Sequence, residues 1–158
     1  MEEQKISFIR TGFLELLKKA EPSVAPAWGK MSFQQMVEHM VLVFKNANGK
    51  LKQEIVTPAD KLELMRAFMM GPKEFRENTK SPVFPEEPLP LHFPNSLAAL
   101  AKLETEIAHF FEVYQRDPEL LIRNPVFGDL NYEESLTLLY KHTRHHARQF
   151  GLIQDTKH

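Results

Sequence analysis

The chain has no cysteine among its 158 residues. This absence excludes disulfide bonds, thiolate metal sites and a cysteine nucleophile, and it fits a reducing compartment. A protein-bound metal ion would therefore need histidine, carboxylate or water ligands.

An excess of one sign of charge is also missing, because 20 Lys and Arg residues face 21 Asp and Glu residues. Without a net field to attract phosphates or anionic lipids, we expect no nucleic-acid or membrane partner. The sequence also lacks long apolar runs, and its first residues, MEEQKISFIR, lack the apolar stretch of a signal peptide. We therefore expect a cytoplasmic protein.

The residues that are present have the composition of an ordinary globular protein, 42% hydrophobic and 26% charged. The length suits one domain with a substantial core, so we expect a single helical domain over residues 1–158. Apolar residues at helical spacing and end signals predict helices over residues 5–20, 33–48, 58–70, 96–115 and 132–150. Two of them should start with capping boxes, Ser32 with Gln35 and Asn131 with Glu134.

One of these helices carries an expected core stripe. In residues 96–115 the stripe comprises Leu97, Leu100, Ala101, Leu103, Glu104, Ile107, Ala108 and Phe111. Six of the eleven prolines fall between Gly71 and Pro94, which predicts a long crossover without regular helices. Short β strands are possible near residues 82–93, and Pro118 and Pro125 bound a short irregular piece. The fold class predicted from these elements is all-α.

Histidines carry the chemistry of this sequence. His142 and His146 are four residues apart, so their rings project from one face of the last helix. This spacing lets two imidazoles reach one metal ion at about 2.0 to 2.1 Å. Seven histidines would give such a pair by chance about 0.3 times, so the spacing alone is weak. Ser135, Leu139 and Gln149 share the stripe, which turns the pair partly inward.

His39 is the predicted third ligand. Met36, Met40 and Val43 flank it on an apolar helix face. A lone histidine on such a face is more often a hydrogen-bonded core residue than a ligand, but three histidines from two helices would leave open metal positions for water and substrate.

The other histidines have weaker claims to be ligands. His145 is also within one turn of His142, but it lies about 100° around the helix from His146 and is expected beside the site. Structural or solvent-facing roles are expected for His92, His109 and His158.

A basic cluster borders the histidine pair. Lys141, Arg144 and Arg148 have no carboxylate between them in the sequence. Such a cluster is usually a solvated face, and the alternative is that it steers an anionic substrate or thiol.

Two segments resemble a known family. WGKMSFQQMVEHM, residues 28–40, and NPVFGDLNYEESLTLLYKHTRHHARQFGLI, residues 124–153, resemble the DinB-like, YfiT-like superfamily of metalloenzymes. The resemblance implies a four-helix bundle of up-down-down-up order, with a long proline-rich crossover over residues 71–94. It also implies a zinc or nickel ion on His39, His142 and His146, and a homodimer.

Three functions follow as hypotheses. The first, implied by the resemblance, is a metal-dependent thiol S-transferase acting on small electrophiles with a thiol such as bacillithiol, mycothiol or glutathione. In it, Gln149 would orient a ligand ring, and Trp28 and His145 would border the pocket. The second is a metal-dependent hydrolase with Glu38 as general base. The third is a non-catalytic helical binding or stress-response module.

Overall fold

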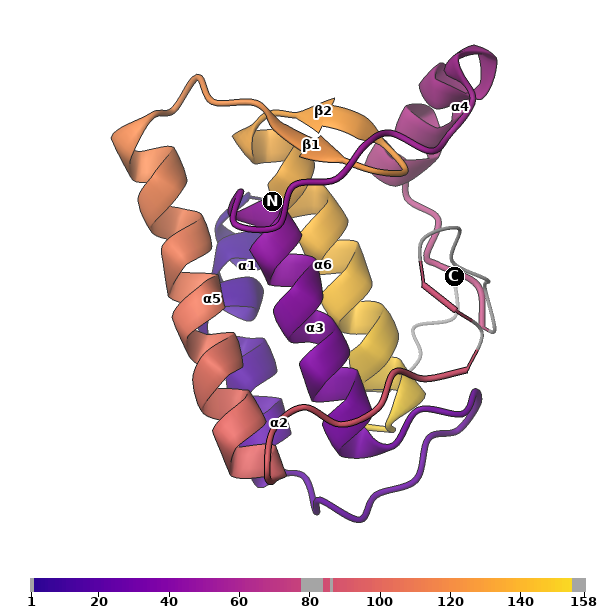
Figure 1. Ribbon diagram of the computed structural model, residues 1–158, viewed down its shortest axis with the longest axis vertical. Coiled ribbons are helices and arrows are strands. Elements are labelled where there is room, and N and C mark those ends of the chain that lie inside the picture. Colours follow the sequence, from indigo (N-terminus) through magenta and orange to yellow (C-terminus); the bar gives the residue numbers. More distant parts are fainter. Residues whose placement is uncertain (1, 78–83, 86, 155–158) are drawn as a thin grey trace.

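The computed structural model describes residues 2–77, 84–85 and 87–154. The described chain is mostly helical, with one small sheet. Its elements are α1 (Glu2–Ser7), the π-helical turn η1 (Phe8–Gly12), α2 (Phe13–Lys19), α3 (Phe33–Ala47), α4 (Ala59–Met70), α5 (Ser96–Arg116), β1 (Ile122–Asn124), β2 (Gly128–Leu130) and α6 (Tyr132–Gln149). Figure 1 shows α1 to α2, α3, α5 and α6 packed alongside one another, while α4 projects from one end. None of the described helices combines the length and apolarity needed to span a membrane.

The predicted first helix is continuous from α1 to α2. Ser7 and Gly12, at the junctions with η1, both keep right-handed helical dihedral angles, so the π turn widens the helix without breaking it. Ile9, Phe13 and Leu17 from this helix are buried in the core.

Both predicted capping boxes are present. The Ser32 hydroxyl accepts from the Gln35 backbone amide at 3.1 Å, and the Gln35 side chain accepts from the Ser32 amide at 2.9 Å. Asn131 and Glu134 exchange the same pair of bonds, both at 2.9 Å. These caps fix the starts of α3 and α6, the two helices that carry the candidate metal ligands.

The core stripe of α5 was predicted only in part. Leu100, Leu103, Ile107 and Phe111 are buried as expected, but Leu97 is 77% exposed. Ala101, Glu104 and Ala108 are also exposed. Because α5 packs against both α3 and α2, its buried face is turned toward Ala99, Glu106 and Phe110.

Glu106 is a fully buried carboxylate that the stripe did not predict. Its oxygens accept from Asn48 Nδ2 at 2.9 Å, from Lys50 Nζ at 3.0 and 3.1 Å and from Lys102 Nζ at 2.9 Å. Burial raises the pKa of Glu106, but the hydrogen bonds from Lys102, Asn48 and Lys50 outweigh it and bring the pKa to about 2. The carboxylate therefore ties the end of α3 to the middle of α5.

We expect Glu106→Gln to lower the free energy of unfolding by about 2 kcal/mol, because hydrogen bonds from charged donors are lost. Urea denaturation at pH 7 measures this change. Glu104→Gln is the matched control, since Glu104 pairs with Lys18 at 3.2 Å on the exposed face of the same helix and should cost under about 1 kcal/mol. Equal effects of the two substitutions would contradict this role of Glu106.

The all-α prediction needs a correction between α5 and α6. Here β1 and β2 form an antiparallel pair in which Ile122 faces Leu130 and Asn124 faces Gly128. The Asn124 side chain accepts from the backbone amides of the turn, and Gly128 has a φ of 88°. Strands of three residues are too short to show alternation in the sequence, so an irregular piece was predicted instead.

The prediction of short strands near residues 82–93 was wrong for the residues that can be compared. Residues 84, 85 and 87–93 form no strand, and residues 82, 83 and 86 lie outside the described residues.

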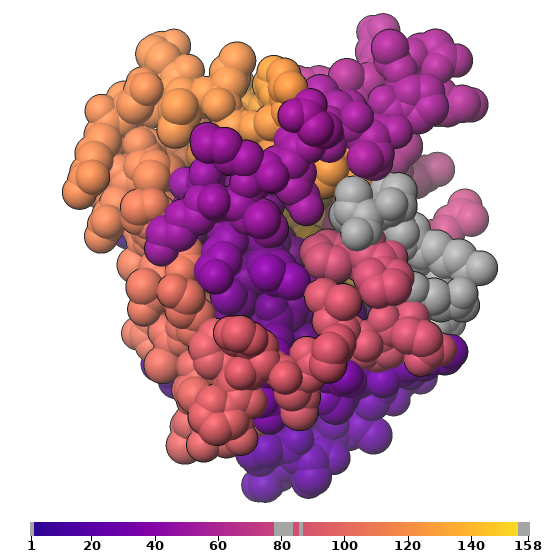
Figure 2. Space-filling view, viewed as in Figure 1, coloured from indigo at the N-terminus to yellow at the C-terminus, as the bar shows by residue number. Residues whose placement is uncertain are grey.

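The crossover from α4 to α5 spans residues 71–95. The first part of this crossover is bound to α6 by ion pairs and hydrogen bonds. Glu74 lies 3.6 Å from Arg144 and 3.2 Å from Arg148. The Lys141 ammonium donates to the carbonyl of Phe68, in the last turn of α4, at 2.9 Å. It also donates to the carbonyl of Gly71, the residue after α4, at 3.0 Å. Further along, the described residues of the crossover extend across the face of α3 in the space-filling view (Figure 2).

Candidate metal centre

Three histidines from two helices converge beside the crossover. His39 lies on α3, and His142 and His146 lie one turn apart on α6. His142 Nε2 is 3.4 Å from His39 Nε2 and 3.1 Å from His146 Nε2, and one ligand atom from each residue lies within 4.8 Å of the other two. The structure therefore brings together the three residues that the sequence predicted as ligands.

This geometry can be compared with that of a metal site. Around a tetrahedral ion with metal–nitrogen bonds of about 2.0 to 2.1 Å, pairs of ligand nitrogens lie about 3.3 Å apart. The separations of 3.4 and 3.1 Å are close to this value, and the nitrogens of the third pair lie within 4.8 Å of each other. The group consists of histidines alone, which leaves at least one position for an added ligand. The donor set fits zinc, nickel or cobalt.

Gln149 determines which nitrogen of His146 faces this cluster. The Gln149 Nε2 group donates to the Trp28 carbonyl at 3.0 Å, so its Oε1 must accept from His146 Nδ1 at 2.8 Å. The proton of a neutral His146 ring is thus on Nδ1, and the lone pair on Nε2 points at the cluster. Trp28 and Gln149 therefore orient the His146 ring toward the cluster, with Gln149 as acceptor rather than the predicted donor.

We expect Gln149→Ala to weaken metal binding by about 10- to 100-fold, because His146 loses the acceptor that fixes its tautomer and orientation. Competition with a chromophoric chelator measures this affinity. Gln115→Ala is the control, since Gln115 is an exposed residue of α5. Wild-type affinity in the Gln149 variant would show that this hydrogen bond does not organise the site.

The three histidine side chains of the cluster are expected to be neutral at physiological pH. Burial lowers the pKa of His39 to about 4, with a smaller contribution from His145. Burial also lowers the pKa of His142 and His146 well below the ordinary value, and the neighbouring histidines add to the shift. Neutral imidazoles keep the lone pairs that a metal requires.

The same shifts predict acid lability of the metal-free protein. Between pH 6.5 and about 4 the unfolded chain binds a proton at His39 that the folded chain does not. Stability should therefore fall as the pH decreases through this window, by about 1.4 kcal/mol per pH unit for each such histidine. Urea denaturation of the chelator-treated protein at pH 7 and pH 5 measures the slope. We expect a smaller slope in His39→Gln, and an equal slope in both proteins would contradict the assignment.

Two phenylalanines of the crossover contact the histidine rings. The Phe84 ring lies 4.9 Å from the His39 ring, and the Phe75 ring lies 5.6 Å from the His142 ring, both edge to face. Sequence reasoning missed both, because a proline-rich segment has no periodic face from which an inward side chain can be inferred.

His145 borders the cluster without being part of the group of three. It is 9% exposed, and its ring lies 5.0 Å from His146, 5.6 Å from Trp28 and 5.9 Å from Phe75. Its Nδ1 has no hydrogen-bond partner among the described residues. Burial lowers the pKa of His145 to about 4, with a smaller effect from Arg148.

Glu38, the predicted general base, is used elsewhere. Its oxygens accept from the backbone amides of His92 at 2.7 Å and Phe93 at 3.1 Å, and from the Gln34 side chain at 2.9 Å. The carboxylate thus ties the end of the crossover to α3. These hydrogen bonds occupy the carboxylate and disfavour the predicted role as general base.

The expectation of a solvated basic face was wrong for Lys141, which is 6% exposed. Lys141 binds the carbonyls at the end of α4, and Arg144 and Arg148 pair with Glu74. No carboxylate lies between these three cations in the sequence, but Glu74 of the crossover supplies one. The cations therefore hold the start of the crossover against α6.

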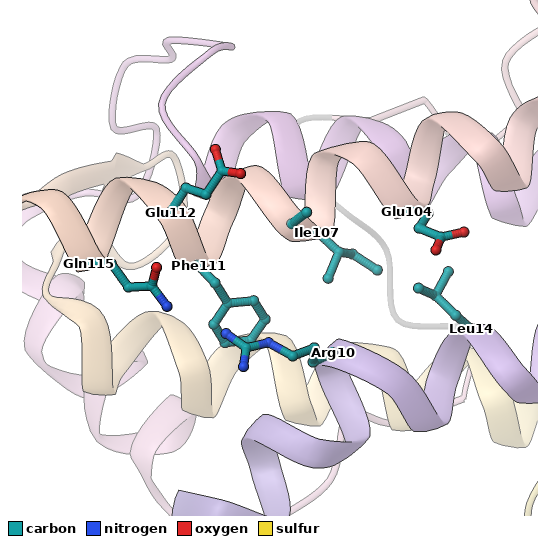
Figure 3. Close-up of a pocket in the computed structure, with 8 residues that line it drawn as sticks. Arg10, Leu14, Glu104, Ile107, Phe111, Glu112 and Gln115 are labelled. Carbon is teal, nitrogen blue, oxygen red and sulfur yellow. The ribbon is translucent and has the colours of Figure 1, made fainter.

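A surface pocket of about 280 Å³ lies away from the histidines, between the first helix and α5 (Figure 3). The Arg10 guanidinium lies 4.2 Å from the centre of the Phe111 ring within it. Its lining residues are Arg10, Leu14, Glu104, Ile107, Ala108, Phe111, Glu112 and Gln115. Without a histidine in this lining, the pocket offers no comparable metal site.

Searches of curated proteins and of solved structures gave no match. A family model described as the DinB superfamily matches residues 11–150, a range that includes all three histidines and most of the chain. The protein therefore belongs to the DinB superfamily.

Proposed function

We propose that this protein binds one divalent metal ion, zinc or nickel, through His39, His142 and His146, and uses it in a thiol S-transferase reaction on small electrophiles. The observation that carries the proposal is the convergence of the three Nε2 atoms, with His142 at 3.4 and 3.1 Å from its two neighbours. Membership of a superfamily that often binds metal supports the same reading.

The choice of a thiol comes from the resemblance to the DinB-like, YfiT-like superfamily, and the donor set and the composition are compatible with it. A bound divalent cation lowers the pKa of a coordinated thiol and so supplies a thiolate near neutral pH. The chain has no cysteine, so in such a reaction the sulfur would come from a low-molecular-weight thiol. In the reaction the thiol releases its proton to solvent, its sulfur forms a bond to the electrophilic carbon, and the leaving group departs with the bonding electron pair.

The chain's own residues position the reaction. His39 and His142 keep neutral rings, and Gln149 directs the His146 lone pair toward the same point. A hydrolase would need a free general base near the cluster, and the occupied oxygens of Glu38 disfavour that alternative.

We also infer the up-down-down-up order of the four long helices. Gln34 contacts Phe93 and Asn48 contacts Glu106, so α3 and α5 run in the same direction. Lys18 pairs with Glu104 while Arg10 lies on Phe111, which supports opposite directions for α2 and α5. Ala27 donates to the Gln149 carbonyl, which places the end of α6 near the start of α3. The course of the ribbons in Figure 1 agrees with this order.

The reaction is tested by incubating metal-loaded protein with 1-chloro-2,4-dinitrobenzene and, separately, bacillithiol, mycothiol or glutathione. We expect loss of free thiol and formation of the dinitrophenyl thioether with one thiol, and neither in His142→Ala. Hydrolysis of ester substrates without thiol consumption would replace the transferase by a hydrolase. Metal binding with neither reaction would leave a non-catalytic binding module.

A further inference from the structure

The side of the histidine cluster that faces the crossover is aromatic. Phe75 and Phe84 are nine residues apart in this segment, and each presents a ring edge to one histidine, His142 and His39 respectively. Both phenylalanines are partly exposed, so their rings are not fully covered by protein.

Phe75 is held firmly. Its ring stacks on Phe68 at 5.9 Å with an interplanar angle of 27°, and the preceding residue, Glu74, pairs with Arg144 and Arg148. Three contacts from α4 and α6 thus fix its position relative to His142. Such a ring serves as a preformed surface for a ligand.

Phe84 has a different setting. Its ring lies 4.9 Å from the His39 ring, edge to face, and its side chain is half-buried. Phe84 therefore contacts a candidate ligand on α3, while Phe75 contacts one on α6.

The charges around the cluster indicate which ligand atoms a bound metal ion would favour. The three candidate ligands are all imidazoles, which carry no negative charge, and the group includes no carboxylate. Glu38 and Glu74, which adjoin His39 and Phe75 in the sequence, bind backbone amides and arginines respectively. A divalent ion held by imidazoles beside aromatic rings favours an anionic ligand atom, because apolar rings screen its charge less than water does.

We propose that Phe75 and Phe84 form an apolar wall that selects ligands joining one anionic metal-binding group to an aromatic substituent. The proposal rests on the metal site proposed above and names the class of ligand that the open metal position would select. The anionic group would bind at the open metal position, and the aromatic substituent would pack against the two rings.

The test uses protein loaded with Co²⁺, whose visible absorption reports ligand binding without any catalytic assay. Acetohydroxamate and benzohydroxamate serve as the probes, because they share the metal-binding group and differ in the aromatic ring. We expect benzohydroxamate to bind the wild-type protein at least about 10-fold more tightly, the effect of one buried aromatic contact.

Phe84→Ala should reduce this preference to under about threefold while leaving acetohydroxamate affinity nearly unchanged. Phe84→Leu should retain part of it, and Leu97→Ala, at a 77% exposed residue of α5, should retain all of it. If the protein binds Co²⁺ but binds both hydroxamates with equal affinity, the proposed aromatic wall is wrong and the proposed metal site is retained. Failure to bind Co²⁺ at all would overturn both.

Discussion

The His142→Ala variant is expected to lose its stoichiometric metal. The wild-type protein should hold about one equivalent after gel filtration, while the variant should hold under about a tenth, since loss of a direct ligand should exceed the 10- to 100-fold effect of losing its supporting partner. His142 lies between the other two donors, 3.4 Å from His39 and 3.1 Å from His146, so its loss separates the cluster. Elemental analysis by mass spectrometry measures the metal content.

His109→Ala provides the matched control. His109 is an α5 residue with a 30% exposed side chain, 3.8 Å from Glu112, and it is outside the cluster. We expect full metal content in this variant and native circular dichroism in both. Equal metal content in His142→Ala and wild type would exclude His142 as a ligand.

Metal binding is also expected to raise the thermal stability strongly. At a free ion concentration 1,000 times the dissociation constant, binding to the folded state alone stabilises it by about 4 kcal/mol. For a protein of this length, that energy corresponds to a rise in Tm of roughly 8 to 16 °C. Thermal denaturation of the same sample with zinc, and again after excess chelator, measures the change.

The control for this experiment is the triple variant His39→Ala, His142→Ala, His146→Ala. Its Tm should not respond to zinc or to chelator. A similar rise in Tm in the triple variant would place the stabilising ion elsewhere on the protein.

Much of the fold and the centre of the site could be predicted from local sequence chemistry. Capping boxes at Ser32 and Asn131 fixed two helix starts, and prolines marked the crossover. The four-residue spacing of His142 and His146 predicted that both rings lie on the same face of the last helix. His39 was harder to predict from residues alone, because only the family resemblance distinguished a ligand from a buried structural histidine.

Several other features that depend on contacts between distant segments were not predicted. Glu106 is buried because Asn48 and two lysines meet it, and a carboxylate at helical spacing does not indicate such partners. Glu74 neutralises a basic cluster some seventy residues away, and Glu38 binds the backbone of a loop. The homodimer, the cytoplasmic location and the choice between zinc and nickel stay predictions.

The most direct measurement of the central claim is X-ray absorption at the metal edge of the loaded protein. Three imidazole nitrogens at about 2.0 to 2.1 Å, with the multiple scattering typical of histidine rings, are the result we predict. A first shell made only of oxygen atoms, or containing a single imidazole, would contradict metal binding by His39, His142 and His146.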